Sequence, residues 1–91
     1  MPGTPSPEGI HVDGFDYVGI YCADKYNVGG GETSLYKPEA AEPIYRRTLE
    51  RGELLVIDDK RLMHCTSAIH ALSADGGTRD VFILTLSNIE P

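Results

Sequence analysis

Short apolar segments separated by turn-forming residues run along the whole chain. Six segments are rich in aliphatic, β-branched and aromatic residues: 17–23, 32–37, 44–49, 54–57, 62–69 and 79–86. Glycine, proline and aspartate gather between these segments. Strands of this length, joined by such turns, are typical of a β-sandwich or a β-barrel. The pattern therefore predicts an all-β protein with roughly seven short strands.

Some segments carry further information. The continuous apolar run at 54–57 predicts a strand that is buried on both faces. In 79–86 both alternating sets of side chains are apolar, and Arg79 stands at the start of one set. We therefore expect Arg79 at the mouth of a buried layer, where a charged group needs an anionic partner. The glycines of 27–31 predict a turn, and 39–47 is compatible with either a strand or a helical turn.

The length of 91 residues allows one domain with a thin hydrophobic core. Residues 1–10 are rich in proline and glycine, which predicts an extended arm. That stretch lacks the apolar core of a signal peptide. Residues 11–91 are then expected to form the folded core, and they contain no internal repeat.

The charge and the cysteines limit the possible partners. A net charge of -6 argues against nucleic acid, because the chain has no basic surface to neutralise phosphates. No apolar run approaches the ~20 residues of a membrane-spanning helix. Cys22 and Cys65 are too few and too far apart for a zinc ribbon or a redox pair. We therefore predict a cytoplasmic protein, without a disulfide and without a nucleic-acid or membrane partner.

Three residues form a candidate metal site. His11 and Asp13 are two positions apart, so in an extended chain their side chains point the same way. With His64 they supply two imidazoles and one carboxylate, the ligand set that occupies one face of the iron in non-heme Fe(II) oxygenases. A single histidine is more often an ordinary surface or core residue. His70 competes for the third position, but it lies in the loop after the strand, so we prefer His64.

Other candidates have simpler explanations. Asp58 and Asp59 are interpreted as turn formers before Lys60. Cys65 is expected to be a small buried apolar residue that faces away from the metal. For Arg79 the alternative to a ligand contact is a surface salt bridge with an aspartate. Three hydroxyls are candidates for a further hydrogen bond to a bound carboxylate, those of Thr66, Thr85 and Tyr17.

Four blocks of the sequence, in order, resemble a known family. They are Pro-Glu-Gly-Ile-His-Val-Asp-Gly at 7–14, Gly-Gly-Glu-Thr-Ser at 30–34, the stretch 54–64 that ends in Arg-Leu-Met-His, and Thr-Arg-Asp-Val-Phe-Ile at 78–83. Together they resemble the 2-oxoglutarate/Fe(II)-dependent dioxygenases. Within that family the nearest resemblance is to the bacterial free L-amino-acid hydroxylases of the isoleucine dioxygenase type. The proline that commonly follows the distal histidine's strand is replaced by Ala68.

The resemblance implies a double-stranded β-helix, the jelly-roll or cupin-like fold. It implies that His11, Asp13 and His64 bind Fe(II), and that Arg79 binds the distal carboxylate of the cosubstrate 2-oxoglutarate. With O2, such an enzyme releases succinate and CO2 and oxidises a small-molecule substrate. By the resemblance this substrate is a free amino acid, which gains a hydroxyl on its side chain or an oxygen on sulfur.

Enzymes of this kind are more than twice as long, so the chain resembles the C-terminal half of one, incomplete at its N-terminal side. Two other functions stay open. One is a cupin-like metal-binding or sensor domain, which has no need of a buried arginine at position 79. The other is a catalytically incomplete fragment whose open sheet edge pairs with a second copy to form a homo-oligomer.

Overall fold

The computed structural model describes residues 9–88. Within that range the chain forms antiparallel strands and no helix, which confirms the predicted all-β class. The strands are β1 (Tyr17–Tyr26), β2 (Val28–Gly30), β3 (Glu32–Tyr36), β4 (Tyr45–Thr48), β5 (Leu54–Asp58), β6 (Met63–Thr66), β7 (Ile69–Ala71) and β8 (Thr78–Leu86). Most of the arm predicted at 1–10 lies outside the described residues. The ambiguous segment 39–47 contains a turn and then β4 rather than a helical turn.

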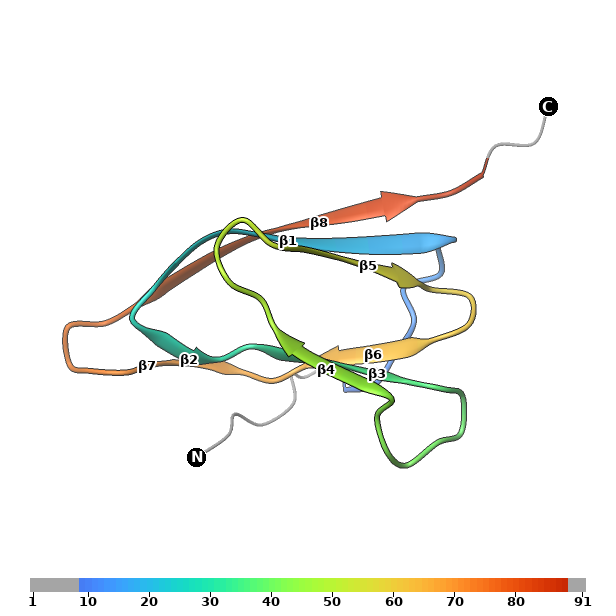
Figure 1. Cartoon of the computed structure of the whole chain (residues 1–91), viewed down its shortest axis with the longest axis horizontal. Helices are drawn as coiled ribbons and strands as arrows, with labels where there is room; N and C mark the ends of the chain where they lie inside the picture. The colour runs from blue at the N-terminus through green and yellow to red at the C-terminus, as the bar shows by residue number, and fades with distance from the viewer. Residues whose placement is uncertain (1–8, 89–91) are drawn as a thin grey trace.

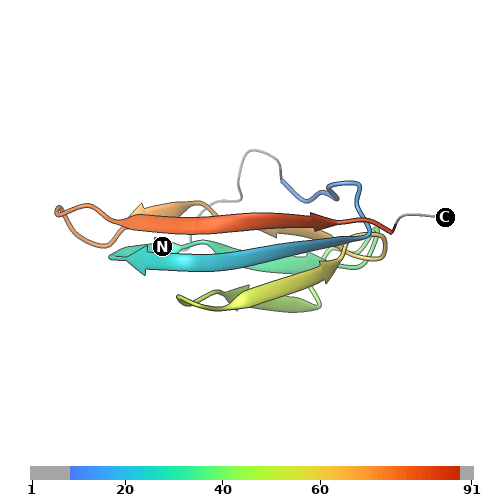
Figure 2. The same ribbon diagram turned by 90° about the horizontal axis from the view of Figure 1, so that it is seen from above.

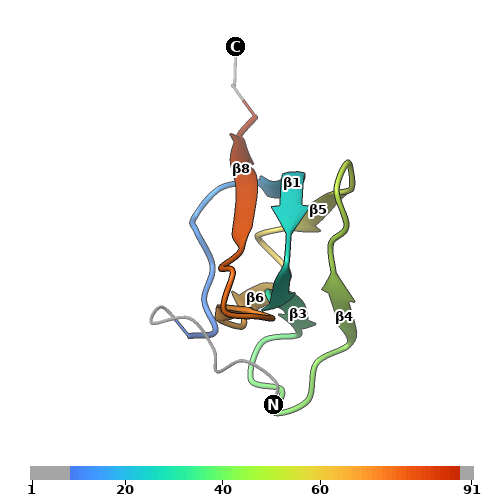
Figure 3. The same cartoon turned by 90° about the vertical axis from the view of Figure 1, so that its left-hand side faces the viewer.

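The strands form two layers that face each other, in the manner of a jelly roll (Figure 1). One layer is a sheet with the order β5-β1-β8, and the other contains a sheet with the order β4-β3-β6. The short ribbon of β2 and β7 extends the second layer on one side (Figure 1). Figure 2 looks onto the first layer, and Figure 3 shows both layers from one end.

The longest pairing joins β1 to β8 and positions Arg79. The register runs from Tyr17 opposite Leu86 to Tyr26 opposite Thr78, with a bulge between Cys22 and Asp24. Beyond the bulge Arg79 lies opposite Lys25, at the end of the sheet where β1 leads into β2 and β8 begins. A bulge re-aims the side chains that follow it, and such irregularities often lie near functional sites.

The segment predicted as one strand at 62–69 is two strands. It breaks after Thr66, so that β6 pairs with β3 while β7 pairs with β2. The chain opposite bends at the same place, between β2 and β3, and β2 itself lies inside the predicted turn at 27–31. Gly30 makes this bend possible. Its φ is +79°, and a Cβ there would stand 2.1 Å from the carbonyl oxygen of Ala68, so only glycine fits.

The core lies between the layers and is small. Its central cluster consists of Ile20, Cys22, Leu35, Leu49 and Ile57. Both cysteines are buried and unbonded, which confirms Cys65 as a small buried residue. Across residues 9–88 there is no helix that is long and apolar enough to span a membrane.

The prediction that residues 54–57 are buried on both faces is wrong. Ile57 is buried, but Leu54 and Val56 are 52% and 54% exposed. The reason is that β5 belongs to an antiparallel sheet that packs against the other layer with one face only. The same holds for β8, where Phe82 and Leu84 lie on the outer face. The outer face of the sheet β5-β1-β8 is therefore apolar and exposed within the described residues.

Candidate metal centre

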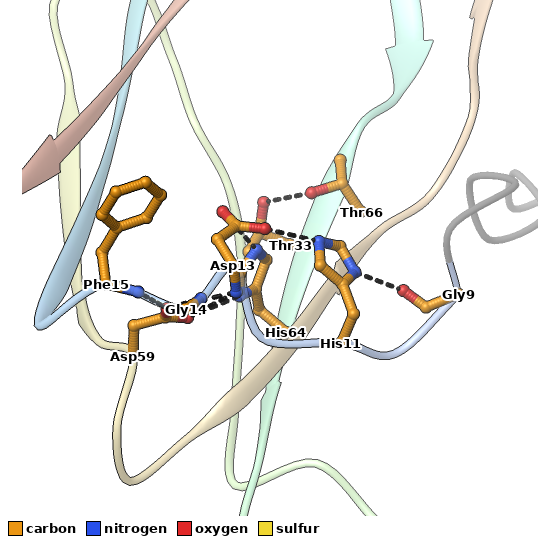
Figure 4. A network of polar contacts seen from close by, with 9 residues as sticks. All are labelled: Gly9, His11, Asp13, Gly14, Phe15, Thr33, Asp59, His64 and Thr66. Atoms are coloured by element: carbon orange, nitrogen blue, oxygen red, sulfur yellow. Dashed lines mark hydrogen bonds and ion pairs between the residues drawn. The ribbon is translucent and has the colours of Figure 1, made fainter.

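The structure brings His11, Asp13 and His64 together (Figure 4). His64 lies on β6, and the other two lie in the segment that precedes β1. His11 pairs with His64 as an isolated antiparallel bridge, in which each backbone N–H donates to the other residue's carbonyl at 2.9 Å. The bridge fixes the segment against the free edge of β6. One ligand atom from each of the three residues lies within 4.8 Å of the others.

The carboxylate of Asp13 contacts both imidazoles. Nε2 of His11 lies 3.0 Å from Oδ1 of Asp13, and Nε2 of His64 lies 3.7 Å from Oδ2. Because metal–nitrogen bonds are about 2.0–2.1 Å long, two neighbouring ligands at a right angle stand about 3 Å apart. The His11–Asp13 separation therefore fits two ligands of one metal ion.

A backbone carbonyl orients the imidazole of His11. Its Nδ1 lies 2.9 Å from the carbonyl oxygen of Gly9. A carbonyl only accepts, so the Nδ1 N–H donates this hydrogen bond. Nε2 then lies on the side of Asp13, where it would offer its lone pair to a metal ion bound between the two groups. Histidine ligands in metal sites are held in this way by a partner on the other ring nitrogen.

Burial keeps the imidazole of His64 in the neutral form. Only 5% of the residue is exposed. Burial, and then the neighbouring His11, lower the pKa of His64, while Asp13 and Asp59 oppose the change. The imidazole is therefore neutral near pH 7, which is the form that binds a metal. Its Nδ1 is the one buried side-chain polar atom in residues 9–88 without a hydrogen-bond partner.

Asp59 holds the segment that carries Asp13 (Figure 4). Its carboxylate accepts hydrogen bonds from the backbone N–H groups of Asp13 at 3.1 Å, Gly14 at 2.7 Å and Phe15 at 2.9 Å. Burial raises the pKa of Asp59, but the three N–H groups outweigh that effect, and the pKa is lowered. Asp59 is thus a buried anion.

Interpreting Asp59 as a turn former missed this role. The turn residue of the pair is Asp58, whose carboxylate accepts from the backbone N–H of Lys60 at 3.2 Å. In the sequence the two aspartates are equivalent, because nothing local shows which one faces inward. The only available signal was the strand alternation after Ile57, which a turn interrupts.

A cavity of about 430 Å³ lies beside the cluster. It is lined by the three candidate ligands and by Val18, Ile20, Thr66, Ser67, Ile69, Arg79, Val81 and Ile83. Its wall is thus mainly aliphatic, with one cation and two hydroxyls. Of the three hydroxyls proposed from the sequence, those of Thr85 and Tyr17 are not part of this lining.

Arg79 lies in the same cavity and has no carboxylate partner among the described residues within 4.0 Å. The salt bridge with an aspartate that the sequence left open is therefore not found in residues 9–88. The guanidinium packs against Gly31, where a Cβ would stand 3.2 Å from Nε. His70, the competing ligand, lies exposed on β7 and outside the metal cluster.

The donor set fits a divalent first-row metal. Two neutral imidazoles and one carboxylate on one side of an ion are the ligands of non-heme iron centres that keep positions open for cosubstrates. Fold and cluster together define the class: a jelly-roll protein with a two-histidine, one-carboxylate metal site.

Comparison with known families agrees with this class. The sequence profile described as 2OG-Fe dioxygenase matches residues 1–85, and the chain belongs to that family. The family implies Fe(II), 2-oxoglutarate and O2 as cofactors. No curated protein matches the chain.

A solved structure shares the fold. The chain is similar to the crystal structure of a BsmA homologue from Methylobium petroleophilum PM1, with 30% sequence identity and a TM-score of 0.72. The match covers 93% of this chain and 35% of that chain. The chain therefore spans about a third of the length of that protein.

Proposed function

We propose that this chain carries the active centre of an Fe(II)/2-oxoglutarate-dependent dioxygenase. In this proposal His11, Asp13 and His64 hold Fe(II), and Arg79 binds the distal carboxylate of 2-oxoglutarate. The observation that carries it is one cavity lined by both the convergent ligand cluster and an arginine without a carboxylate partner in the described residues. When bound, iron would supply the redox chemistry that couples conversion of 2-oxoglutarate to succinate and CO2 with oxidation of a substrate.

The residues of the chain have distinct tasks. The planar guanidinium of Arg79 suits a bidentate contact with a carboxylate. 2-Oxoglutarate carries two negative charges, and in a chain with a net charge of -6 it is attracted only by a local cation. Val18, Ile20 and Val81 line the cavity and keep water from the aliphatic part of the cosubstrate. A drier site also strengthens the attraction between Arg79 and its anion.

For the substrate we propose a free amino acid, hydroxylated on its side chain or oxidised on sulfur. The support is the resemblance of the four sequence blocks to free amino-acid hydroxylases. We place the reaction in the cytoplasm, where two unbonded cysteines are expected to stay reduced. One edge of β8 has no partner strand within the described residues, so a homo-oligomer that pairs through this edge is part of the proposal.

The test is an anaerobic titration of the chain with Fe(II) and 2-oxoglutarate, followed by the visible charge-transfer absorption of an iron-chelated keto acid. We expect the band in the original chain, its loss in His64→Ala, and its retention in His70→Ala. His70→Ala is the matched control, because it removes an exposed imidazole outside the cluster. Absence of the band from a folded chain would refute the proposal.

The cupin-like alternative makes a different prediction. A metal-binding or sensor domain would bind Fe(II) without any change on addition of 2-oxoglutarate. The position of Arg79 in the cavity disfavours it, since a simple metal site has no use for a cation beside it.

A further inference from the structure

Asp59 has a connection to the metal cluster beyond its hold on the backbone. Its side chain is fully buried, and it directly follows β5. Oδ2 accepts from Asp13, Gly14 and Phe15, whereas Oδ1 receives only a second contact from the Asp13 N–H at 3.1 Å. A carboxylate offers about four lone-pair sites, so Oδ1 can still accept another hydrogen bond.

The free side of Oδ1 faces His64. The distance from Oδ1 to Nδ1 of His64 is 4.0 Å, and that Nδ1 is the buried atom without a partner in residues 9–88. A buried polar atom without a hydrogen bond is destabilising, and such atoms are rare in folded proteins. A shift of about 1 Å brings the two atoms to hydrogen-bond distance.

Metal binding would determine which atom is the donor in this contact. If Nε2 of His64 donates its lone pair to a metal, the proton of the neutral ring must sit on Nδ1. Ring N–H groups of histidine ligands donate to a carboxylate, a backbone carbonyl or a water, which fixes the orientation of the ring and makes it a better ligand. Asp59 is the carboxylate that the fold places there.

We propose that Asp59 is a positioning residue for the metal centre, because one buried carboxylate holds two ligands at once. Through Oδ2 it fixes the backbone that carries Asp13, and through Oδ1 it accepts the Nδ1 proton of His64 when Nε2 binds the metal. The inference rests on the proposed function, since it takes the three-residue cluster as the metal site.

Asp59→Asn is the informative variant. The asparagine has nearly the same shape, and its amide oxygen can still accept from the three backbone N–H groups. Its NH2 group then faces His64, and two N–H donors cannot pair. The variant therefore favours the tautomer with the proton on Nε2, in which Nε2 cannot bind a metal. A purely structural role for Asp59 predicts no such effect in a folded variant.

The experiment is a titration with Co(II), an oxygen-tolerant probe with visible absorption, on the full chain and two variants. We expect Asp59→Asn to weaken Co(II) binding by about 10–100-fold. Asp58→Asn is the matched control, because this neighbour contacts only turn groups, and its affinity should stay within about twofold of the original. Circular dichroism verifies that both variants are folded.

A second measurement needs no variant. Nitrogen-15 spectra of the imidazoles in the Zn(II)-loaded chain should show a downfield, slowly exchanging proton on Nδ1 of His64. Metal bound at Nδ1, or an Nδ1 proton that exchanges freely with water, would overturn the inference. A folded Asp59→Asn with unchanged Co(II) affinity would also overturn it, and the proposed function would stand. Failure of the original chain to bind Co(II) would instead remove the proposed function, and this inference with it.

Discussion

The bend between β2 and β3 should be stable only when residue 30 has no side chain. In Gly30→Ala two effects add. A left-handed backbone at an alanine costs about 1–2 kcal/mol, and the added Cβ meets the carbonyl oxygen of Ala68 at 2.1 Å. Forcing such a contact into a packed region costs about 1–3 kcal/mol more. The expected loss is therefore about 2–5 kcal/mol, a large part of the stability of a small domain.

Gly52→Ala is the matched control for this prediction. Gly52 has a similar φ of +86°, but nothing lies within 4 Å of the Cβ that alanine would add. It should lose only the backbone contribution, about 1–2 kcal/mol, which lowers the Tm by about 4–8 °C per kcal/mol. Urea unfolding followed by circular dichroism measures both. Equal losses of unfolding free energy in the two variants would show that the bend between β2 and β3 relaxes freely, and the argument from the Ala68 contact would be wrong.

Two further predictions concern the cavity and its ligands. Arg79→Lys replaces a planar guanidinium by a single ammonium group and should weaken 2-oxoglutarate binding by about tenfold or more. Arg61→Lys, at an exposed arginine, is the control and should leave the affinity unchanged. Calorimetry in the presence of Co(II) measures both, and equal affinities in the two variants would argue against a role for Arg79. The free energy of unfolding should also decrease in two steps as the pH is lowered. The pKa of His64 is lowered below 6.5, so its contribution is complete above pH 6.5 and declines below it, while that of Asp59 is lowered below 3.8 and its contribution is lost only in stronger acid. Urea midpoints from pH 7.5 to pH 3 would test this, and a constant midpoint between pH 7 and pH 5 would contradict the His64 step.

Much of the fold was predictable because the chain alternates strands and turns with little ambiguity. The positions of β1, β3, β5 and β8 follow from runs of β-branched and aromatic residues. Their burial did not follow, since an apolar run has the same appearance whether one or both of its faces are covered. Leu54 and Val56 show this, because their outer face has no covering layer in residues 9–88.

Part of the candidate site was also predictable from the sequence, and part was not. The grouping of His11, Asp13 and His64 was predicted from residue type and order, and the structure places them within reach of one another. Asp59 was interpreted as a turn former, and its role at the site was not predicted, because that role depends on three backbone N–H groups from a distant segment. The break between β6 and β7 was also missed, since a bend imposed by an opposing strand leaves no local signal.

The bridge between His11 and His64 also bears on how stable the protein is against unfolding and proteolysis. The two residues are far apart in the sequence, and one pair of backbone hydrogen bonds joins His11 to His64. A metal shared between them would act as a cross-link that closes a long loop, and the entropy removed from the unfolded chain grows with the length of that loop. A metal at about 100 times its Kd would add about 2.7 kcal/mol to the free energy of unfolding. Metal supply would then govern how much of the chain escapes proteolysis, and a metal-starved cell would hold less of the protein.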